Sequence, residues 1–372
     1  MATDWEAEGL LEGLEDEARE ARGELLEKLS ADGVPLDELK RAVAEARLVF
    51  LPIERALQGD GRRYTAKEVA DEAGLDLDYL YALWAALGIA RPEPSEKAFS
   101  GEDLESARNI KRAREIGMPD AEILEIARVM GQSTSRLAEA IGRSFAQAFL
   151  RPGDTEHDLA LRYAEATREL LPLVGPLVQN TLRLHQRENV RRAAVGLEEL
   201  QEGRLPDAQQ VAVGFADLVG FTKLGARVPA DELGAVAGKL EELATEAASG
   251  PVRLVKTIGD AAMLVSPEPE PLVDAVLDVV ETADEEGEAF PAVHAGMGWG
   301  EALQRAGDWY GHPVNLASRI TDFARPGSAV ASKELRDAVE DGDYAWSFAG
   351  NRRLKGVKGE VPLYRVRRPE VD

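Results

Sequence analysis

Cysteine is absent from this chain of 372 residues, which excludes disulfide bonds, thiolate metal sites and cysteine nucleophiles. Histidine is scarce, and its four residues leave little material for metal sites built on imidazole. Any metal ion must therefore be held mainly by oxygen, the ligand atom that hard ions such as Mg²⁺ prefer.

Basic residues are outnumbered, since 44 lysines and arginines face 68 aspartates and glutamates and the formal net charge is −24. A field of this sign repels nucleic acid and anionic lipid on average, so binding to either would need a local basic patch, and we expect no nucleic acid as a partner. An anionic nucleotide can still bind where metal ions accompany it.

Long apolar runs are also missing. The longest, 80-LYALWAALGIA-90, is shorter than the roughly 18 uncharged residues that a membrane span needs, and it indicates a packed helix. The beginning of the chain, MATDWEAEG, is acidic and lacks the basic and then apolar layout of a signal peptide. We therefore expect a cytoplasmic protein without stable membrane insertion.

The chain changes character near 201-QEGRLPDAQQ-210. Before this point Glu, Ala, Leu and Arg recur at helical spacing, and after it short β-rich runs alternate with helical segments. The sequence predicts an all-helical domain over residues 1–190, a linker helix and connection over 177–206, and a domain of mixed helices and strands over 207–369. The expected strands are 210–218, 252–258, 261–265, 291–299 and 361–367, and the expected helices lie near 230–249, 270–286 and 313–323.

Two prolines, Pro172 and Pro176, interrupt the helical pattern just before the linker helix. Each removes a backbone donor and clashes with the preceding turn, so the pair predicts a broken or kinked path.

Two aspartates stand at the ends of β-rich runs. Asp217 closes the apolar part of 213-VGFADLVGFT-222, and Asp260 follows Gly259 in the expected hairpin turn of 255-VKTIGDAAM-263. Taken singly, Asp217 could cap a helix and Gly-Asp could be only a turn. A carboxylate at the carboxyl end of a strand also faces the crevice in which folds of this kind bind ligands.

A third segment, 307-GDWYGHPVNLASRI-320, places Asn315 and Arg319 four residues apart on one face of an expected helix. Pro313 suits the first turn of that helix. An arginine on a helix is usually a solvated surface residue, so this segment needs its context to indicate a function.

These three segments, in this order, resemble the catalytic motifs of class III adenylyl cyclases. The resemblance implies an α+β cyclase domain with a ferredoxin-like or palm-like mixed sheet. It implies metal binding by Asp217 and Asp260, selection of adenine by Lys256 and Asp308, and action on the transition state by Asn315 and Arg319. A surface salt bridge or a turn aspartate is the alternative for the adenine pair. The segment 311-GHPVN-315 departs from the Gly-Asp-Ala-Val-Asn of many members.

The resemblance also implies a substrate and cofactors, namely ATP with two Mg²⁺ or Mn²⁺ ions at each site. A lysine of the terminal hairpin, Lys358 or Lys355, would contact the triphosphate. Cyclases of this class build each site across a two-fold interface, so a homodimer with two sites is expected.

The arrangement of a helical half before the cyclase domain resembles the mycobacterial pH-sensing adenylyl cyclases, in which an N-terminal regulatory domain inhibits catalysis and can bind a fatty acid. His185, on the linker helix, is the candidate regulatory residue, because imidazole titrates near neutral pH. His294, within an expected strand, is interpreted as a core histidine.

Two other functions stay open for the chain. The segment 64-YTAKEVADEAGLDLDYLYALWAALGI-89 weakly resembles a MerR-type helix-turn-helix, which would suit a DNA-binding regulator, but its second helix has no basic residue. We interpret it as a packed helical module. A catalytically silent nucleotide sensor is the other alternative.

Overall fold

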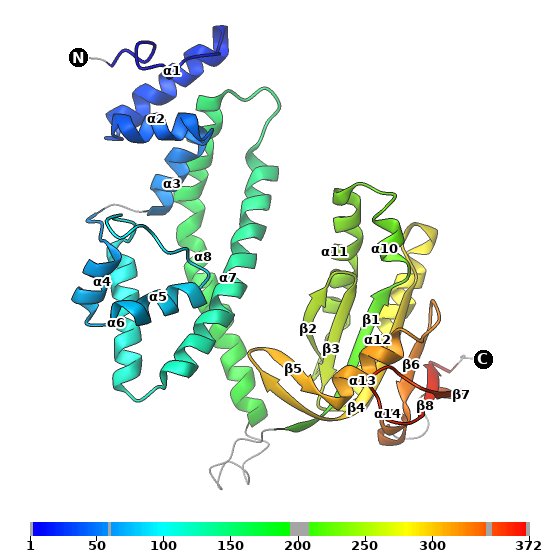
Figure 1. Ribbon diagram of the computed structural model, residues 1–372. Coiled ribbons are helices and arrows are strands. Elements are labelled where there is room, and N and C mark those ends of the chain that lie inside the picture. The colour runs from blue at the N-terminus through cyan, green and yellow to red at the C-terminus, as the bar shows by residue number, and fades with distance from the viewer. Residues whose placement is uncertain (1–2, 59–60, 194–207, 340–343, 370–372) are drawn as a thin grey trace. The chain divides into compact units, whose positions relative to one another are not determined.

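The computed structural model describes residues 3–58, 61–193, 208–339 and 344–369. The chain divides into two compact units, Met1–Val195 and Gly196–Asp372, coloured blue to green and green to red in Figure 1. The predicted fold class, an all-α part followed by an α+β part with a mixed sheet, is confirmed. Each unit has apolar cores of its own.

The first unit consists of helices in its described residues, and local capping explains where several of them begin. Thr65 and Glu68 form a reciprocal capping box at the start of α4, and Ser100 and Asp103 form another at the start of α6. No described helix combines the length and the apolar character that crossing a bilayer requires. The helices are α1 (Asp16–Ala31), α2 (Leu36–Ala44), η1 (Leu48–Phe50), α3 (Leu51–Gln58), α4 (Ala66–Ala73), α5 (Leu77–Ala86), α6 (Gly101–Glu115), α7 (Asp120–Phe149) and α8 (Glu156–Ala193).

Two separate apolar cores hold these helices together. One joins α1, α2 and α3 to the beginning of α8, and the other joins α4, α5 and α6 to the first half of α7. In the second core Trp84 stacks on Phe99 with 3.9 Å between ring centroids. The helix-turn-helix-like segment therefore packs as a module, because Leu80, Leu83 and Trp84 of its second helix are buried.

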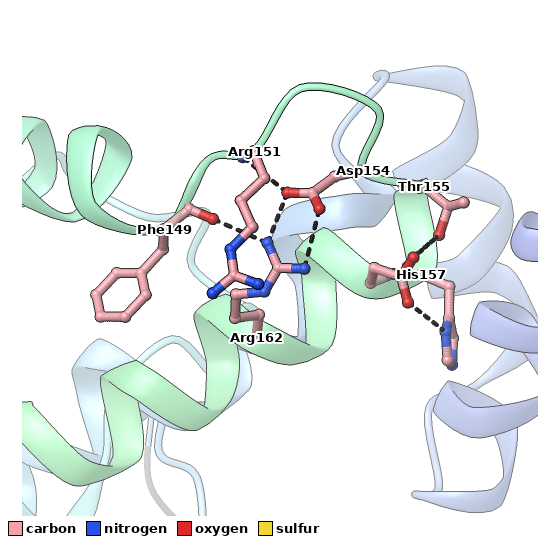
Figure 2. Close-up of polar contacts among 7 residues, drawn as sticks. Phe149, Arg151, Asp154, Thr155, His157 and Arg162 are labelled. Carbon is pink, nitrogen blue, oxygen red and sulfur yellow. Dashed lines mark hydrogen bonds and ion pairs between the residues drawn. The ribbon is translucent and has the colours of Figure 1, made fainter.

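Hydrogen bonds from one arginine, Arg162, stabilise the turn between α7 and α8 (Figure 2). Arg162 donates hydrogen bonds of 2.6 and 2.9 Å to the two carboxylate oxygens of Asp154 and one of 3.0 Å to the carbonyl of Phe149. Nearby, Arg22 of α1 pairs with Glu156 through bonds of 2.7 and 2.9 Å. These paired contacts fix the first turn of α8 to its neighbours.

A broken or kinked path was expected at Pro172 and Pro176, and the break is wrong, because α8 runs through both residues. A proline inside a helix costs about 3 kcal/mol through its missing N–H. Both prolines are exposed, so water can solvate the carbonyls that lose a partner. Being four residues apart, they confine the loss to one face of the helix. The end of the predicted linker, residues 194–206, lies outside the described residues.

The second unit is organised around one mixed sheet with strand order β2-β3-β1-β4-β6-β8-β7, and β5 folds back on the end of β4 as a hairpin (Figure 1). All paired strands are antiparallel except β4 and β6. The first four strands have the order and connections of a ferredoxin-like fold. The strands are β1 (Gln209–Leu218), β2 (Arg253–Ile258), β3 (Ala261–Ser266), β4 (Val293–Arg305), β5 (Asp308–Gly311), β6 (Ala329–Ser332), β7 (Ala345–Arg352) and β8 (Val361–Arg367).

Helices cover both faces of this sheet. Alternate residues of β1 point to opposite layers: Ala212 and Ala216 pack with α11 and α12, whereas Val211 and Val213 share a cluster with Ala317 of α13. The helix that carries Asn315 and Arg319 therefore packs on the face of the sheet opposite to α11 and α12. The helices of this unit are α10 (Phe221–Leu224), α11 (Ala230–Ala247), α12 (Pro269–Glu285), η3 (Gly287–Ala289), α13 (His312–Thr321) and α14 (Lys333–Ala338).

Candidate active site

Asp217 lies near the carboxyl end of β1, directly between Ala261 of β3 and His294 of β4 in the register of the sheet. Its side chain is 30% exposed. Its Oδ1 atom is buried and has no hydrogen-bond partner among the described residues, while Oδ2 lies 3.6 Å from Nε2 of His294. A buried carboxylate oxygen without a partner is costly, and a bound cation would satisfy it.

Asp260 occupies the turn between β2 and β3. Gly259, at φ +64°, supplies the left-handed backbone that this turn requires. The N–H of Leu218 donates a 3.0 Å bond to the carbonyl of Asp260, so this turn is fastened to the end of β1. The two acidic turns that the sequence singled out therefore lie next to each other.

The electrostatics of this pair suit a divalent cation. Burial, and then the negative charge of Asp217, raise the pKa of the Asp260 carboxyl above its ordinary value. Two carboxylates that repel each other in a partly buried place, one with an unpartnered oxygen, offer an all-oxygen donor set. Hard ions such as Mg²⁺ and Mn²⁺ fit such a set.

Lys256 of β2 and Asp308 at the start of β5 form a direct ion pair, although the two positions are 52 apart in the sequence. Both side chains are partly buried, at 30% and 27% exposure. The other oxygen of Asp308 accepts a 2.8 Å bond from the N–H of Trp309, which fixes the carboxylate. The fold thus places one cationic donor beside one anionic acceptor, and the contact itself also agrees with the alternative of a simple salt bridge.

Asn315 and Arg319 lie on the exposed face of α13, opposite the buried Leu316 and Ile320. The side chain of Arg319 is 45% exposed, and its guanidinium pairs with Asp322 one turn later, at 3.4 Å. Within one chain, both groups are therefore open to a molecule approaching this face of the helix.

Close packing against β4 sets the distance between α13 and the sheet. A Cβ atom added at Gly296 would lie 2.2 Å from the backbone nitrogen of Thr321 and 2.5 Å from the carbonyl of Ala317. One added at Gly298 would lie 3.0 Å from the carbonyl of Pro313. Because no real side chain tolerates such approaches without movement, glycine lets the backbone of α13 rest directly on the strand.

His294 is the residue of this site that the sequence reasoning assigned to the core alone. The interpretation holds in part, since the side chain is 16% exposed and Nδ1 is 2.9 Å from the carbonyl of Ala324. A carbonyl only accepts, so Nδ1–H is the donor and Nε2 faces Asp217. The contact with Asp217 is the main cause that raises the pKa of His294, against the opposing effect of burial. Only the register between β1 and β4 reveals this neighbour.

Two other predicted residues lie apart from these groups. Lys358 and its alternative Lys355 are exposed in the segment between β7 and β8, and no contact joins them to the other predicted substrate groups in the described part of the chain. His185 is exposed on α8 in the first unit.

Known families and relatives match along nearly the whole chain. The model of the adenylate cyclase regulatory domain matches residues 3–190, and that of the adenylate and guanylate cyclase catalytic domain matches residues 204–285. The pH-sensitive adenylate cyclase MT1302 of Mycobacterium tuberculosis (strain CDC 1551 / Oshkosh) is 40% identical over 99% of this chain and 93% of its own length. An adenylate cyclase of Streptomyces coelicolor is 32% identical over 75% of this chain and 72% of its own.

Among solved structures, the guanylate cyclase domain of RhGC from Catenaria anguillulae in complex with GTP covers 44% of this chain and 98% of its own, with 25% identity and a TM-score of 0.38. The regulatory-domain match spans half of the chain, and the mycobacterial relative aligns with both units. The chain therefore belongs to the class III adenylate cyclases that join an N-terminal regulatory domain to the catalytic domain.

Proposed function

We propose that this protein converts ATP to 3′,5′-cyclic AMP and pyrophosphate, and that Lys256 and Asp308 select the adenine base. The observation that carries the proposal is the direct contact of these two side chains in the unit that also pairs Asp217 with Asp260. Adenine presents an acceptor at N1 and a donor at N6, which a lysine donor and an aspartate acceptor complement. Guanine reverses both groups and would leave two charges mispaired.

Asp217 and Asp260 would hold the divalent ions. The reaction joins the ribose 3′-oxygen to the α-phosphorus and breaks the bond to pyrophosphate. When bound, a pair of ions lowers the pKa of the attacking hydroxyl and neutralises charge on the leaving group. The unpartnered Oδ1 of Asp217 supports this assignment, because it is the acceptor that an ion would use.

Asn315 would orient the ribose, and Arg319 would bring fixed positive charge to the phosphates. A guanidinium stays protonated at any physiological pH and binds phosphate oxygens in pairs. Both side chains project from one exposed face of α13, a helix held rigidly on β4. Lys358 is a further candidate for the triphosphate, from the segment between β7 and β8.

Each site would lie between two copies of the chain, with the ions on one protomer and the other four groups on its partner. The exposure of Arg319 supports this arrangement, because its guanidinium is open to a partner. Since one chain carries both sets of groups, a two-fold dimer would contain two equivalent sites.

Mixing two inactive variants tests the chemistry and the dimer together. Asp217→Ala chains and Arg319→Ala chains are each expected to be inactive with ATP and Mn²⁺. An equal mixture should recover about a quarter of wild-type cyclic AMP formation, because half of the dimers are mixed and each holds one intact site. No recovery would contradict the shared site, and no cyclic AMP from the wild type would contradict the proposed activity.

The first unit would regulate catalysis, and pH is the proposed signal because the mycobacterial relative is named as pH-sensitive. His185 is the candidate sensor, since it is exposed on α8, the last described helix before the catalytic unit. A fatty acid bound to the first unit stays a prediction from the resemblance.

A further inference from the structure

Lys256, one of the two residues proposed to select the base, is directed by a β-bulge in β2. In a regular strand Leu254 and Lys256 would point to the same face of the sheet. Instead the register with β3 shifts between these two residues. Leu254 pairs with Leu264, which packs with α11 and α12. Lys256 pairs with Met263 on the opposite face, so the bulge turns the lysine toward the face that α13 covers.

The extra residue of the bulge, Val255, packs on an apolar cluster that also contains Trp309. The buried members of this Trp309 cluster are Val211, Val213, Met263, Val265, Ala302, Trp309 and Ala317. Trp309 has the largest side chain among them. The cluster therefore holds the chain next to both partners of the ion pair, one residue before Lys256 and one residue after Asp308.

Trp309 also contacts Asp308 through its backbone. The side chain of Trp309 is only 4% exposed, and its N–H donates a 2.8 Å bond to Oδ1 of Asp308. Oδ2 of the same carboxylate is the atom that contacts Lys256. Because the buried indole fixes the position of its own backbone, it also fixes the donor that orients the carboxylate.

The indole of Trp309 contributes by its apolar shape. Its Nε1 atom is buried and has no hydrogen-bond partner among the described residues. A buried donor without a partner is costly, so the polar atom does not explain why a tryptophan stands here, whereas the large apolar area of the ring does. A phenylalanine would keep most of that packing and would lose only the donor.

We propose that Trp309 is a positioning residue for base selection: its burial in the Trp309 cluster holds the carboxylate of Asp308 beside the ammonium group of Lys256. The inference rests on the proposed function and adds to it a residue for which the family resemblance implied no role. Asp217 and Asp260 lie outside this cluster, so a change at Trp309 should affect recognition of the base more than the chemistry.

Three substitutions separate positioning from general stability. Trp309→Leu removes the aromatic packing and leaves both charged groups in the chain. Trp309→Phe keeps an aromatic ring in the cluster. Trp346→Leu is the matched control, because Trp346 is a partly buried tryptophan of β7 that packs on the other core of the sheet, the one shared with α11 and α12.

The measurement is kcat/KM of the full chain for ATP and for GTP at saturating Mn²⁺, together with the melting temperature. We expect Trp309→Leu to lower the ratio of the ATP value to the GTP value about 10-fold or more, since misplacing a recognition group by about 1 Å can cost about 100-fold. KM for ATP should rise more than kcat falls. Trp309→Phe should keep most of the ratio, and Trp346→Leu should lower only the melting temperature.

An unchanged ratio in Trp309→Leu would overturn the inference, and so would an equal loss of the ratio in Trp346→Leu. A Trp309→Phe chain that loses the ratio as fully as Trp309→Leu would contradict a role through packing. Loss of the thermal transition in Trp309→Leu would make the indole a folding residue. Asp308→Asn in the same assay tests the proposed function itself: an unchanged ratio there, or a wild type that forms no cyclic AMP, would overturn that proposal instead.

Discussion

At the scale of single residues, a substitution of Asp308 tests whether this carboxylate recognises the base. In Asp308→Asn the acceptor loses its charge, and its amide can present a donor where adenine also donates. We expect kcat/KM for ATP to fall about 10- to 100-fold, since a hydrogen bond to a charged group is worth about 1.5–3 kcal/mol. The value for GTP should fall less, so the ratio of the two, measured under the same conditions, should shrink.

Asp337→Asn is the control for this substitution. Asp337 pairs with Lys333 four residues earlier, and both side chains are about half exposed, at 44% and 51%. An exposed pair of this kind contributes at most about 1 kcal/mol, so neither nucleotide should be affected. An unchanged ratio of ATP to GTP in Asp308→Asn would show that the ion pair with Lys256 is only structural.

Single residues differ in how far the sequence reveals them. Asp217 and Asp260 stand out because a carboxylate at a strand end and a Gly-Asp turn are local patterns. The pairing of Lys256 with Asp308 came only from the family resemblance, since the two positions are 52 apart in the sequence. His294 could not be found without the register of β1 and β4, because a histidine among apolar residues looks like core.

At the scale of elements, the packing of α13 on β4 predicts that one methyl group added to β4 lowers both stability and activity. In Gly296→Ala the new Cβ would meet backbone atoms of α13 at 2.2 and 2.5 Å, so the helix must move. We expect a loss of about 1–3 kcal/mol in the free energy of unfolding and a fall in kcat that exceeds the change in KM. Denaturant unfolding and steady-state kinetics measure the two effects.

Gly234→Ala is the matched control for this element. Gly234 is exposed in α11, and a Cβ there would meet no atom within 4 Å. Alanine should stabilise this helix by about 0.5–1 kcal/mol and leave kcat unchanged. If Gly296→Ala behaved like this control, the glycines of β4 would not set the position of α13.

The turn between α7 and α8 gives a prediction about pH (Figure 2). Hydrogen bonds from Arg162 lower the pKa of Asp154 below its ordinary value of 3.8. A lowered carboxyl pKa stabilises the fold above 3.8, and the effect is lost as pH falls through the folded value. Asp154→Asn should therefore lower the melting temperature by a constant amount from about pH 7 to 5, with the difference shrinking only below about pH 4.

A difference in melting temperature that changed between pH 7 and 5 would contradict this account of the Asp154 contact. A constant difference in melting temperature would exclude the pair of Asp154 and Arg162 as a sensor of mild acid. The imidazoles, with His185 first among them, would then be the remaining candidates in the helical unit.

The elements themselves were predictable where their patterns were long. β1, β2, β3 and β8 agree with the expected strands to within one residue, because each is an unbroken β-rich run. β5 and β6, at four residues each, are too short to show a period, and β4 extends beyond its predicted end. For α8 the error is of another kind. The two prolines predicted an interruption, but the helix continues through them.

At the scale of the whole molecule, the change of composition near residue 200 was the most informative feature of the sequence. The helical unit and the sheet-containing unit have apolar cores with no member in common. We therefore expect that the two activities proposed for them, regulation and catalysis, can be separated by cutting the chain between the cores. How the first unit would control the second is a property of neither core, so the resemblance to regulated cyclases is the only guide that the sequence offers.

Deletion of residues 1–200 tests that control directly. If the first unit inhibits catalysis, the remaining chain should form cyclic AMP about 5-fold faster or more at the pH where the full chain is least active, since coupling between sites is typically 1–3 kcal/mol. Its rate should also lose the pH dependence of the full chain between mildly acid and neutral conditions. The same pH profile is measured for the full chain with His185→Ala. If this variant also loses the pH dependence, the imidazole of His185 is responsible; if only the deletion loses it, another part of the first unit is responsible. A truncated protein with a cooperative thermal transition and the rate of the full chain would show that the helical unit does not inhibit the catalytic one.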